Sequence, residues 1–269
     1  MRVSAWPFGE AGHKAIVGMV HLGPVLQGKL ALGDVIEAAV RDAAALAEGG
    51  VDAICVENFG DTPFYPDRVP AHTVAGMTRA VLAVSEAVGG SGAVIGVNVL
   101  RNDVLSALAV AAATGAGFVR VNVHQGAAVT DQGLVVGQAH ESVRYRDQLA
   151  PGCAIFADVH VKHAAPLVTR PIEDEARELV ERGGADAIIV SGAHTGGATD
   201  PARLAKVRGA VPHARLLVGS GATPETLPGL APHADGFIVG TWLKADGDVA
   251  RPVDVSRVRR MVAAVRALS

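Results

Sequence analysis

Cysteine and aromatic residues are scarce in this chain of 269 residues, and charge of neither sign dominates it. It has 2 cysteines, 2 tryptophans, 2 tyrosines and 6 phenylalanines, and its 24 Lys and Arg residues are matched by 27 Asp and Glu residues. Cys55 and Cys153 lie inside apolar runs without a CxxC spacing, which argues against a disulfide, a metal site or a thiol nucleophile. The lack of a basic excess, and of any zinc-finger or basic-helix pattern, argues against nucleic acid as a partner.

Long apolar runs are also missing. The longest, residues 107–119, is interrupted by Thr114 and two glycines and ends at Arg120, so it is too short to span a bilayer. Residues 1–13 lack the continuous apolar segment of a signal peptide. We therefore expect a cytoplasmic protein without a membrane span. The length suits one domain, residues 1–269.

What the sequence does contain is a repeating unit of strand and helix. Short runs rich in Val, Ile and Ala end in polar residues and give way to Ala-rich helical segments, about eight times. The predicted strands are residues 15–20, 51–56, 93–99, 117–123, 153–159, 186–190, 215–218 and 236–239. This alternation is typical of an α/β protein with a single (β/α)8 TIM barrel, in which chemistry gathers at the C-terminal ends of the strands.

The polar residues that end the predicted strands are therefore the candidate site. Glu57 and Asp158 are an acid and base pair for proton transfer, and Lys162 is either a Schiff-base nucleophile, a cation for an oxyanion, or a solvated loop lysine. His160, His21 and Asn122 complete the catalytic candidates. The expected substrate-binding residues are Asn98, Arg101, Arg120, Ser191, Gly192 and Thr195.

A divalent metal is possible at the same rim, although we expect no required cofactor. Imidazole and carboxylate groups suit zinc, manganese or iron, and Asp158, His160 and His124 are the ligands expected if a metal is present. No HExxH motif accompanies them.

Glycines follow the seventh and eighth predicted strands. In phosphate-binding barrels the anion lies between these two loops, where glycine lets backbone N–H groups approach the ligand. Gly219, Ser220 and Gly221 with Gly240 and Thr241 therefore predict a phosphate site, and a helix starting near Thr223 would add positive charge. The alternative is that these glycines only form turns.

Several long motifs resemble the BtpA/SgcQ family, over nearly the whole chain. They are residues 16–24, 50–53, 56–64, 96–102, 120–123, 157–163, 190–192, 195–196, 219–221 and 235–241. The resemblance implies a barrel related to the ribulose-phosphate-binding group. It also implies links to sugar-phosphate metabolism in one branch and to photosystem I accumulation in another.

Two functions follow. The first is an enzyme acting on a small phosphorylated, sugar-containing metabolite, as an isomerase, a lyase or a glycoside-type hydrolase. The second is a non-catalytic photosystem I assembly factor that docks through its exterior or through the long loop after Glu57. The aromatic residues at 59–65 also favour a homo-oligomer, because such a loop is well suited to burial against a second subunit.

Overall fold

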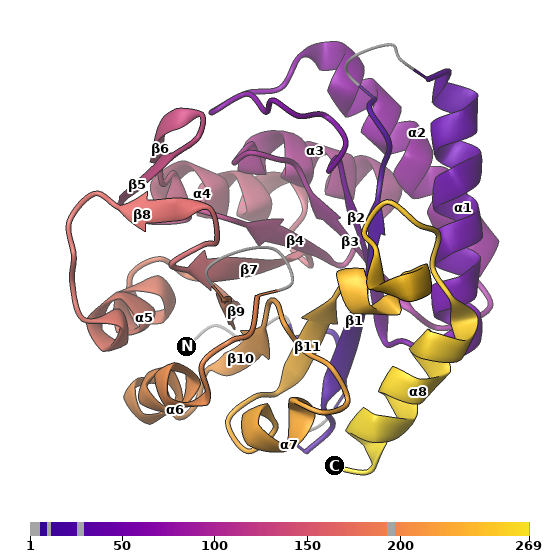
Figure 1. Ribbon diagram of the computed structural model, residues 1–269. Coiled ribbons are helices and arrows are strands. Elements are labelled where there is room, and N and C mark those ends of the chain that lie inside the picture. The colour runs from indigo at the N-terminus through magenta and orange to yellow at the C-terminus, as the bar shows by residue number, and fades with distance from the viewer. Residues whose placement is uncertain (1–5, 10–11, 26–29, 193–196, 269) are drawn as a thin grey trace.

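The computed structural model describes residues 6–9, 12–25, 30–192 and 197–268. Eight parallel strands close into a barrel in the order β1-β11-β10-β9-β7-β4-β3-β2, which confirms the predicted TIM barrel (Figure 1). All eight predicted strands form, with small shifts at their ends. Their bounds are β1 Ala15–His21, β2 Ala53–Glu57, β3 Val94–Asn98, β4 Phe118–Val121, β7 Ala154–Val159, β9 Ala187–Val190, β10 Arg215–Val218 and β11 Gly236–Val239.

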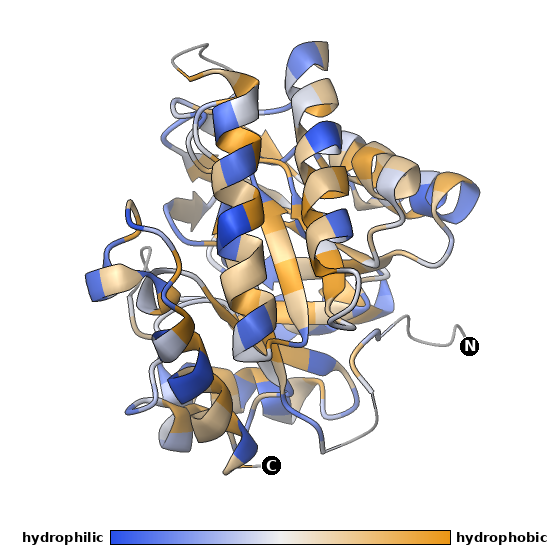
Figure 2. Ribbon diagram, turned by 90° about the vertical axis from the view of Figure 1, so that its right-hand side faces the viewer, coloured by the Kyte–Doolittle hydropathy of each residue, from blue (hydrophilic) through white to orange (hydrophobic). Residues whose placement is uncertain are grey.

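Helices surround the barrel and connect its strands. They are α1 Leu32–Gly49, α2 Ala71–Val88, α3 Val104–Thr114, α4 Ala139–Leu149, α5 Ile172–Glu181, α6 Pro201–Ala210, α7 Leu227–Leu230 and α8 Val255–Arg266, with 3-10 turns η1 Thr241–Leu243 and η2 Ala245–Gly247. Figure 2 shows hydrophobic strands behind helices that alternate hydrophilic and hydrophobic residues, as expected for helices with one buried face. No helix in the described ranges has the length and apolar character needed to cross a membrane.

The strands separate two hydrophobic cores. Ile16 and Val20 of β1 face the helices, whereas Val17 and Met19 face the barrel interior. Because both faces are buried, the strands appear in the sequence as continuous apolar runs. The Phe118 and Phe156 rings stack in the barrel interior, with their centroids 4.6 Å apart. In the part of the chain that the structure describes, aromatic rings therefore pack the barrel interior beneath the C-terminal ends of the strands.

A small antiparallel sheet of order β6-β5-β8 was not predicted. Strands β5 (Ala127–Thr130) and β6 (Gly133–Val136) form a hairpin after β4, and β8 (Ala164–Pro166) follows β7. These strands have only three or four residues each, so their periodicity is too short to distinguish from a loop. Figure 1 shows the sheet beside the C-terminal ends of β4 and β7, close to α5.

The long loop after Glu57 is packed against its neighbours. Asn58 and Asp61 are buried, and the Asn58 side chain accepts a hydrogen bond from Leu100 N at 2.7 Å. A Cβ atom at Gly60 would lie 2.7 Å from Gly23 C, so glycine permits close contact with the segment after β1. Tyr65 is the large apolar residue of this loop that remains exposed.

Candidate active site

The last inward-facing residue of each barrel strand contributes to a polar layer above the apolar core. Side chains alternate along a strand, so His21 follows Val17 and Met19 on the inner face, and Glu57 follows Cys55. Asn98, Arg120 and Asp158 take this place on β3, β4 and β7, and Ser191, Gly219 and Gly240 directly follow the ends of β9, β10 and β11. Every residue of this layer is a site residue that the sequence predicts.

A buried ion pair occupies one side of the layer. Arg120 donates from Nε and Nη2 to the two carboxylate oxygens of Asp158, both at 2.9 Å. Asn122 Nδ2 and Ser191 Oγ donate to the same carboxylate at 3.2 and 3.1 Å. With four donors and almost no exposed surface, the Asp158 carboxylate holds Arg120 in place.

Glu57 has one engaged and one available carboxylate oxygen. Asn98 Nδ2 donates to Oε2 at 2.6 Å, which fixes the carboxylate, while Oε1 lies 3.8 Å from His21 Nε2. The His21 ring stacks on Phe59, with centroids 4.6 Å apart. Of the two predicted acid and base residues, Glu57 is therefore the one whose geometry suits proton transfer.

Lys162 is partly buried at the edge of this layer. Burial lowers the pKa of its ammonium group, and the nearby Arg120 guanidinium lowers it further. The predicted alternative of a solvated loop lysine does not fit this burial. Arg101 supports the same segment, because its Nη2 donates to Lys162 O at 2.8 Å. A lysine that loses its proton more easily than usual can act as a nucleophile or a proton donor.

These residues border a cavity of about 160 Å³ in the barrel mouth, here called the mouth cavity. His21, Glu57, Arg120 and Lys162 line it together with the residues after β10 and β11. Phe59 and Trp242 also line it. Neither was predicted, although Trp242 directly follows Thr241 and Phe59 lies two residues after Glu57.

The glycine loops after β10 and β11 line the mouth cavity, but the expected helix is absent there. The helix after β10 begins at Leu227 and has only four residues, so its N-terminus does not lie at Thr223. A Cβ at Gly240 would lie 2.9 Å from His21 Cε1, and Gly221 has a φ of +70. Within the described residues, no partner accepts from the amides of Gly221, Ala222, Gly240 or Thr241.

Two other predicted binding residues, Ser220 and Gly192, connect the segment after β10 with the segment after β9. The Ser220 hydroxyl accepts from Gly192 N at 2.8 Å and donates to Gly197 O at 3.1 Å. A Cβ at Gly192 would lie 2.4 Å from Gly197 O, so the two segments pack closely. Thr195 lies outside the described residues.

The three possible metal ligands do not converge. His124 Nε2 lies 2.9 Å from Gly183 O, and His160 Nε2 lies 2.9 Å from Glu175 Oε2, while Asp158 is committed to Arg120. The described part of the chain contains no group of three His, Cys, Asp or Glu side chains arranged for a metal ion. His160 and Asn122 belong to the wall of a separate cavity beside β4 and β7, so they lie apart from the mouth cavity.

The pH dependence of folding stability tests whether His21 is buried and neutral. Burial, with the nearby Lys244 and Lys162 charges, lowers the pKa of His21 to about 3. An unfolded chain protonates the same imidazole near pH 6.5. Folding stability should therefore fall as the pH drops below 6.5, by about 1 kcal/mol between pH 6.5 and 5.5 from this residue.

Urea unfolding at those two pH values measures this loss. The His21→Gln variant has no group to protonate at this position and should show a shallower pH dependence than the wild-type protein. Imidazole NMR signals of His21 that titrate near pH 6 in the folded protein would contradict the buried, neutral state.

Comparisons with known proteins agree with this architecture. The model of the BtpA family matches residues 12–267. A protein of Thermococcus kodakarensis is 46% identical over 93% of this chain and 94% of its own length. The photosystem I biogenesis protein BtpA of Synechocystis is 43% identical, over 94% of this chain and 88% of its own, and the sgc region protein SgcQ of Escherichia coli is 32% identical, over 93% of both.

Solved structures share the fold at low sequence identity. KGPDC from Streptococcus mutans has a TM-score of 0.61 at 11% identity, covering 95% of this chain and 99% of that one. N-(5'-phosphoribosyl)anthranilate isomerase from Pyrococcus furiosus has a TM-score of 0.57 at 13% identity, covering 95% and 100%. At these identities the likeness is one of fold.

Proposed function

This chain belongs to the BtpA family, and we propose that it is an enzyme that acts on a small phosphorylated, sugar-containing metabolite in the mouth cavity. The observation that carries this proposal is a cavity with two kinds of lining. Cationic and proton-transferring side chains line it together with the segments after β10 and β11, whose amides at Gly221, Ala222, Gly240 and Thr241 have no partner among the described residues.

These amides are suited to a phosphate group. The N–H groups of Gly221, Ala222, Gly240 and Thr241, which have no partner among the described residues, would be donors for phosphate oxygens. Arg120 adds charge, because Nε and Nη2 bond to Asp158 while Nη1 has no partner in the described chain. An anion in this position would gain donors that are already oriented.

The side chains that line the mouth cavity would supply the chemistry. Glu57 would exchange a proton through Oε1, with Asn98 holding Oε2, and the neutral His21 would remain a hydrogen-bonding group. Lys162, with its lowered pKa, would either attack a carbonyl carbon or stabilise a developing oxyanion. Isomerisation, carbon–carbon or carbon–nitrogen cleavage, and glycoside-type cleavage all use such a set.

A thermal-shift screen against phosphorylated sugars, nucleotides and inorganic phosphate, with and without divalent metals, tests this proposal. A phosphorylated ligand at 100 times its Kd should raise the free energy of unfolding by about 2.7 kcal/mol. The Gly240→Ala variant should lose this stabilisation, because its Cβ would meet the His21 ring at 2.9 Å.

The matched control is Gly152→Ala. Gly152 has no neighbouring atom within 4 Å of a built Cβ, so this variant should bind the ligand like the wild-type protein. Wild-type protein that is folded yet shows no shift with any phosphorylated compound would count against the phosphate site. Equal shifts in the wild-type and Gly240→Ala proteins would place the ligand elsewhere.

The second candidate function is that of an assembly factor, suggested by the name of the Synechocystis relative. Its supporting observation is exposed apolar surface, at Tyr65 in the loop after β2 and at Val129, Leu134 and Val136 in the small sheet. These residues are also the surface that we propose for a homo-oligomer. An assembly role predicts that replacing Phe64 and Tyr65 abolishes function while replacing Glu57 does not.

A further inference from the structure

Lys162 differs from the other lysines of the chain in having an unengaged amine at a cavity. Within the described residues, its Nζ makes no hydrogen bond and no ion pair, and the side chain lines the mouth cavity. The sequence contains four other lysines. Lys244 forms a buried ion pair, Lys14 donates to two backbone carbonyl groups, Lys206 is exposed on α6, and Lys29 lies outside the described residues.

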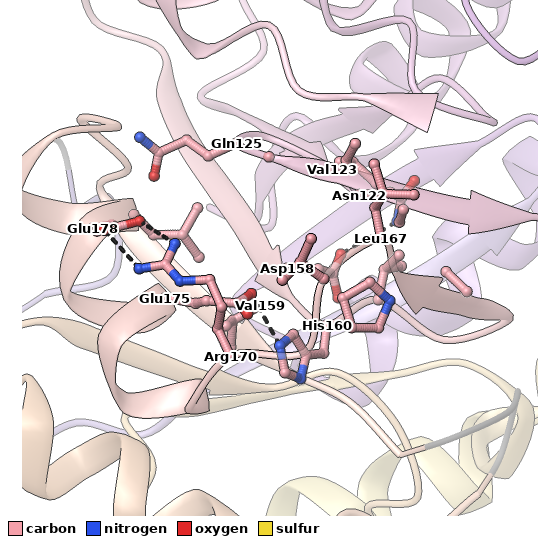
Figure 3. Close-up of a pocket in the computed structure, with 18 residues that line it drawn as sticks. Asn122, Val123, Gln125, Asp158, Val159, His160, Leu167, Arg170, Glu175 and Glu178 are labelled. Carbon is pink, nitrogen blue, oxygen red and sulfur yellow. Dashed lines mark hydrogen bonds and ion pairs between the residues drawn. The ribbon is translucent and has the colours of Figure 1, made fainter. Parts of the chain in front are cut away.

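The chain directs Lys162 into the mouth cavity while the two residues before it point elsewhere. Figure 3 shows His160 turned toward Glu175 in the separate cavity beside β4 and β7, and Val161 is 5% exposed within a small apolar cluster. Arg101 holds the main chain at this point, because its Nη2 donates to Lys162 O at 2.8 Å. Lys162 Nζ has no partner, yet it is not among the polar atoms that are shut off from solvent, so a ligand in the mouth cavity can reach it.

The surroundings of this amine favour its uncharged form. Within the described chain no carboxylate lies at ion-pair distance from Nζ, and the Asp158 carboxylate is engaged by both nitrogens that Arg120 donates. Burial lowers the pKa of Lys162, and the Arg120 guanidinium lowers it further. Since Arg120 already supplies a permanent positive charge, the structure suits Lys162 to act as a neutral nucleophile rather than as a second cation.

We propose that Lys162 forms an imine with the carbonyl carbon of a phosphorylated aldehyde or ketone in the mouth cavity. This inference rests on the proposed function and narrows it to one class of substrate. An imine serves isomerisation or carbon–carbon cleavage next to the carbonyl group, and it has no use in glycoside-type cleavage.

The step balances with the residues that line the cavity. Glu57 takes the proton that Lys162 loses on becoming a neutral amine. The Nζ lone pair then forms a bond to the carbonyl carbon, and one amine proton moves to the carbonyl oxygen. Glu57 protonates the resulting hydroxyl group, which leaves as water while the nitrogen lone pair forms the C=N bond of the iminium ion. No oxidant or reductant is needed, and the Glu57 carboxylate can next accept a proton from the substrate.

Reductive trapping of the full chain tests the proposal. Sodium cyanoborohydride reduces an imine to a stable amine, and peptide mass spectrometry then identifies the modified lysine. The probes are dihydroxyacetone phosphate and ribulose 5-phosphate, with glycerol 3-phosphate as an analogue that has no carbonyl group. We expect an adduct at Lys162 with the mass of the ketone less one water plus two hydrogens, and none with glycerol 3-phosphate.

Two matched variants separate an imine from a purely electrostatic role. Lys162→Arg keeps the positive charge but cannot form an imine, so the adduct should be lost. Lys206→Arg replaces an exposed lysine on α6 and should keep the adduct at Lys162. Excess inorganic phosphate should reduce the labelling of Lys162, because it competes for the mouth cavity.

Three results would overturn the imine. They are no adduct with either ketone in folded wild-type protein, labelling spread over the lysines according to their exposure, and an adduct of unchanged yield in Lys162→Arg. Thermal stabilisation by glycerol 3-phosphate without an adduct from the ketones would overturn the imine and still support phosphate binding. Labelling of Lys162 that phosphate does not reduce, in protein that no phosphorylated compound stabilises, would support the imine and count against the phosphate site.

Discussion

Replacing Arg120 with methionine is expected to lower the free energy of unfolding by about 3–5 kcal/mol. The guanidinium is 3% exposed and donates twice to an Asp158 side chain with no exposed surface. Without Arg120, the carboxylate keeps only Asn122 and Ser191 as donors and becomes a buried charge without a counter-ion. Chemical denaturation followed by circular dichroism measures the loss.

An exposed ion pair is the matched control for Arg120. Arg259 pairs with Glu48 at 2.8 Å, with both side chains about three-fifths exposed. Arg259→Met should change the unfolding free energy by less than about 1 kcal/mol, because solvent screens such pairs. In the Arg120→Met background, Asp158→Asn should recover part of the stability, since an amide needs no counter-ion. Equal losses for Arg120→Met and Arg259→Met would contradict the network described for the barrel mouth.

Glu57→Gln is expected to reduce turnover by about 10²–10⁴-fold, the range that a general acid or base contributes. The substrate for this assay is a phosphorylated compound that stabilises the wild-type protein, with products followed by phosphorus NMR. Glutamine keeps an oxygen for the 2.6 Å hydrogen bond from Asn98 and leaves the cavity its shape, so binding should persist.

Glu86→Gln controls for the loss of a carboxylate as such, because Glu86 is exposed near the C-terminal end of α2 and does not line the mouth cavity. It should retain full turnover. A Glu57→Gln variant as active as Glu86→Gln would remove Glu57 from the mechanism and leave Lys162 as the group to test.

The barrel and its polar layer follow from the sequence because they rest on strand periodicity. A parallel strand buried on both faces appears as an apolar run. The first polar side chain that points into the barrel marks the C-terminal end of that strand. This reasoning identifies Glu57, Arg120 and Asp158 without knowing that the strands close into a barrel. It predicts where a side chain lies but not its partners, so it does not reveal the four donors that surround the Asp158 carboxylate.

The alternation of side chains no longer predicts position where the chain turns just after a strand. His160 would continue the inner face of β7, yet β7 stops at Val159 and His160 has a φ of +57, which turns the chain toward Glu175. His124 likewise follows the end of β4 and reaches Gly183. Both depend on connections whose course is set by the small sheet, which three-residue and four-residue strands do not reveal in a single sequence.

The pairing of β5 with β8 makes two sequence-distant connections into one module. Residues 128–130 of the connection after β4 are bridged to residues 164–166 of the connection after β7. Shortening either segment, or replacing it with a loop from another barrel, would remove the strand with which the other segment pairs. Transplanting a new specificity into this barrel would therefore require both segments to be moved together, and their backbone amides should exchange with solvent at a common rate.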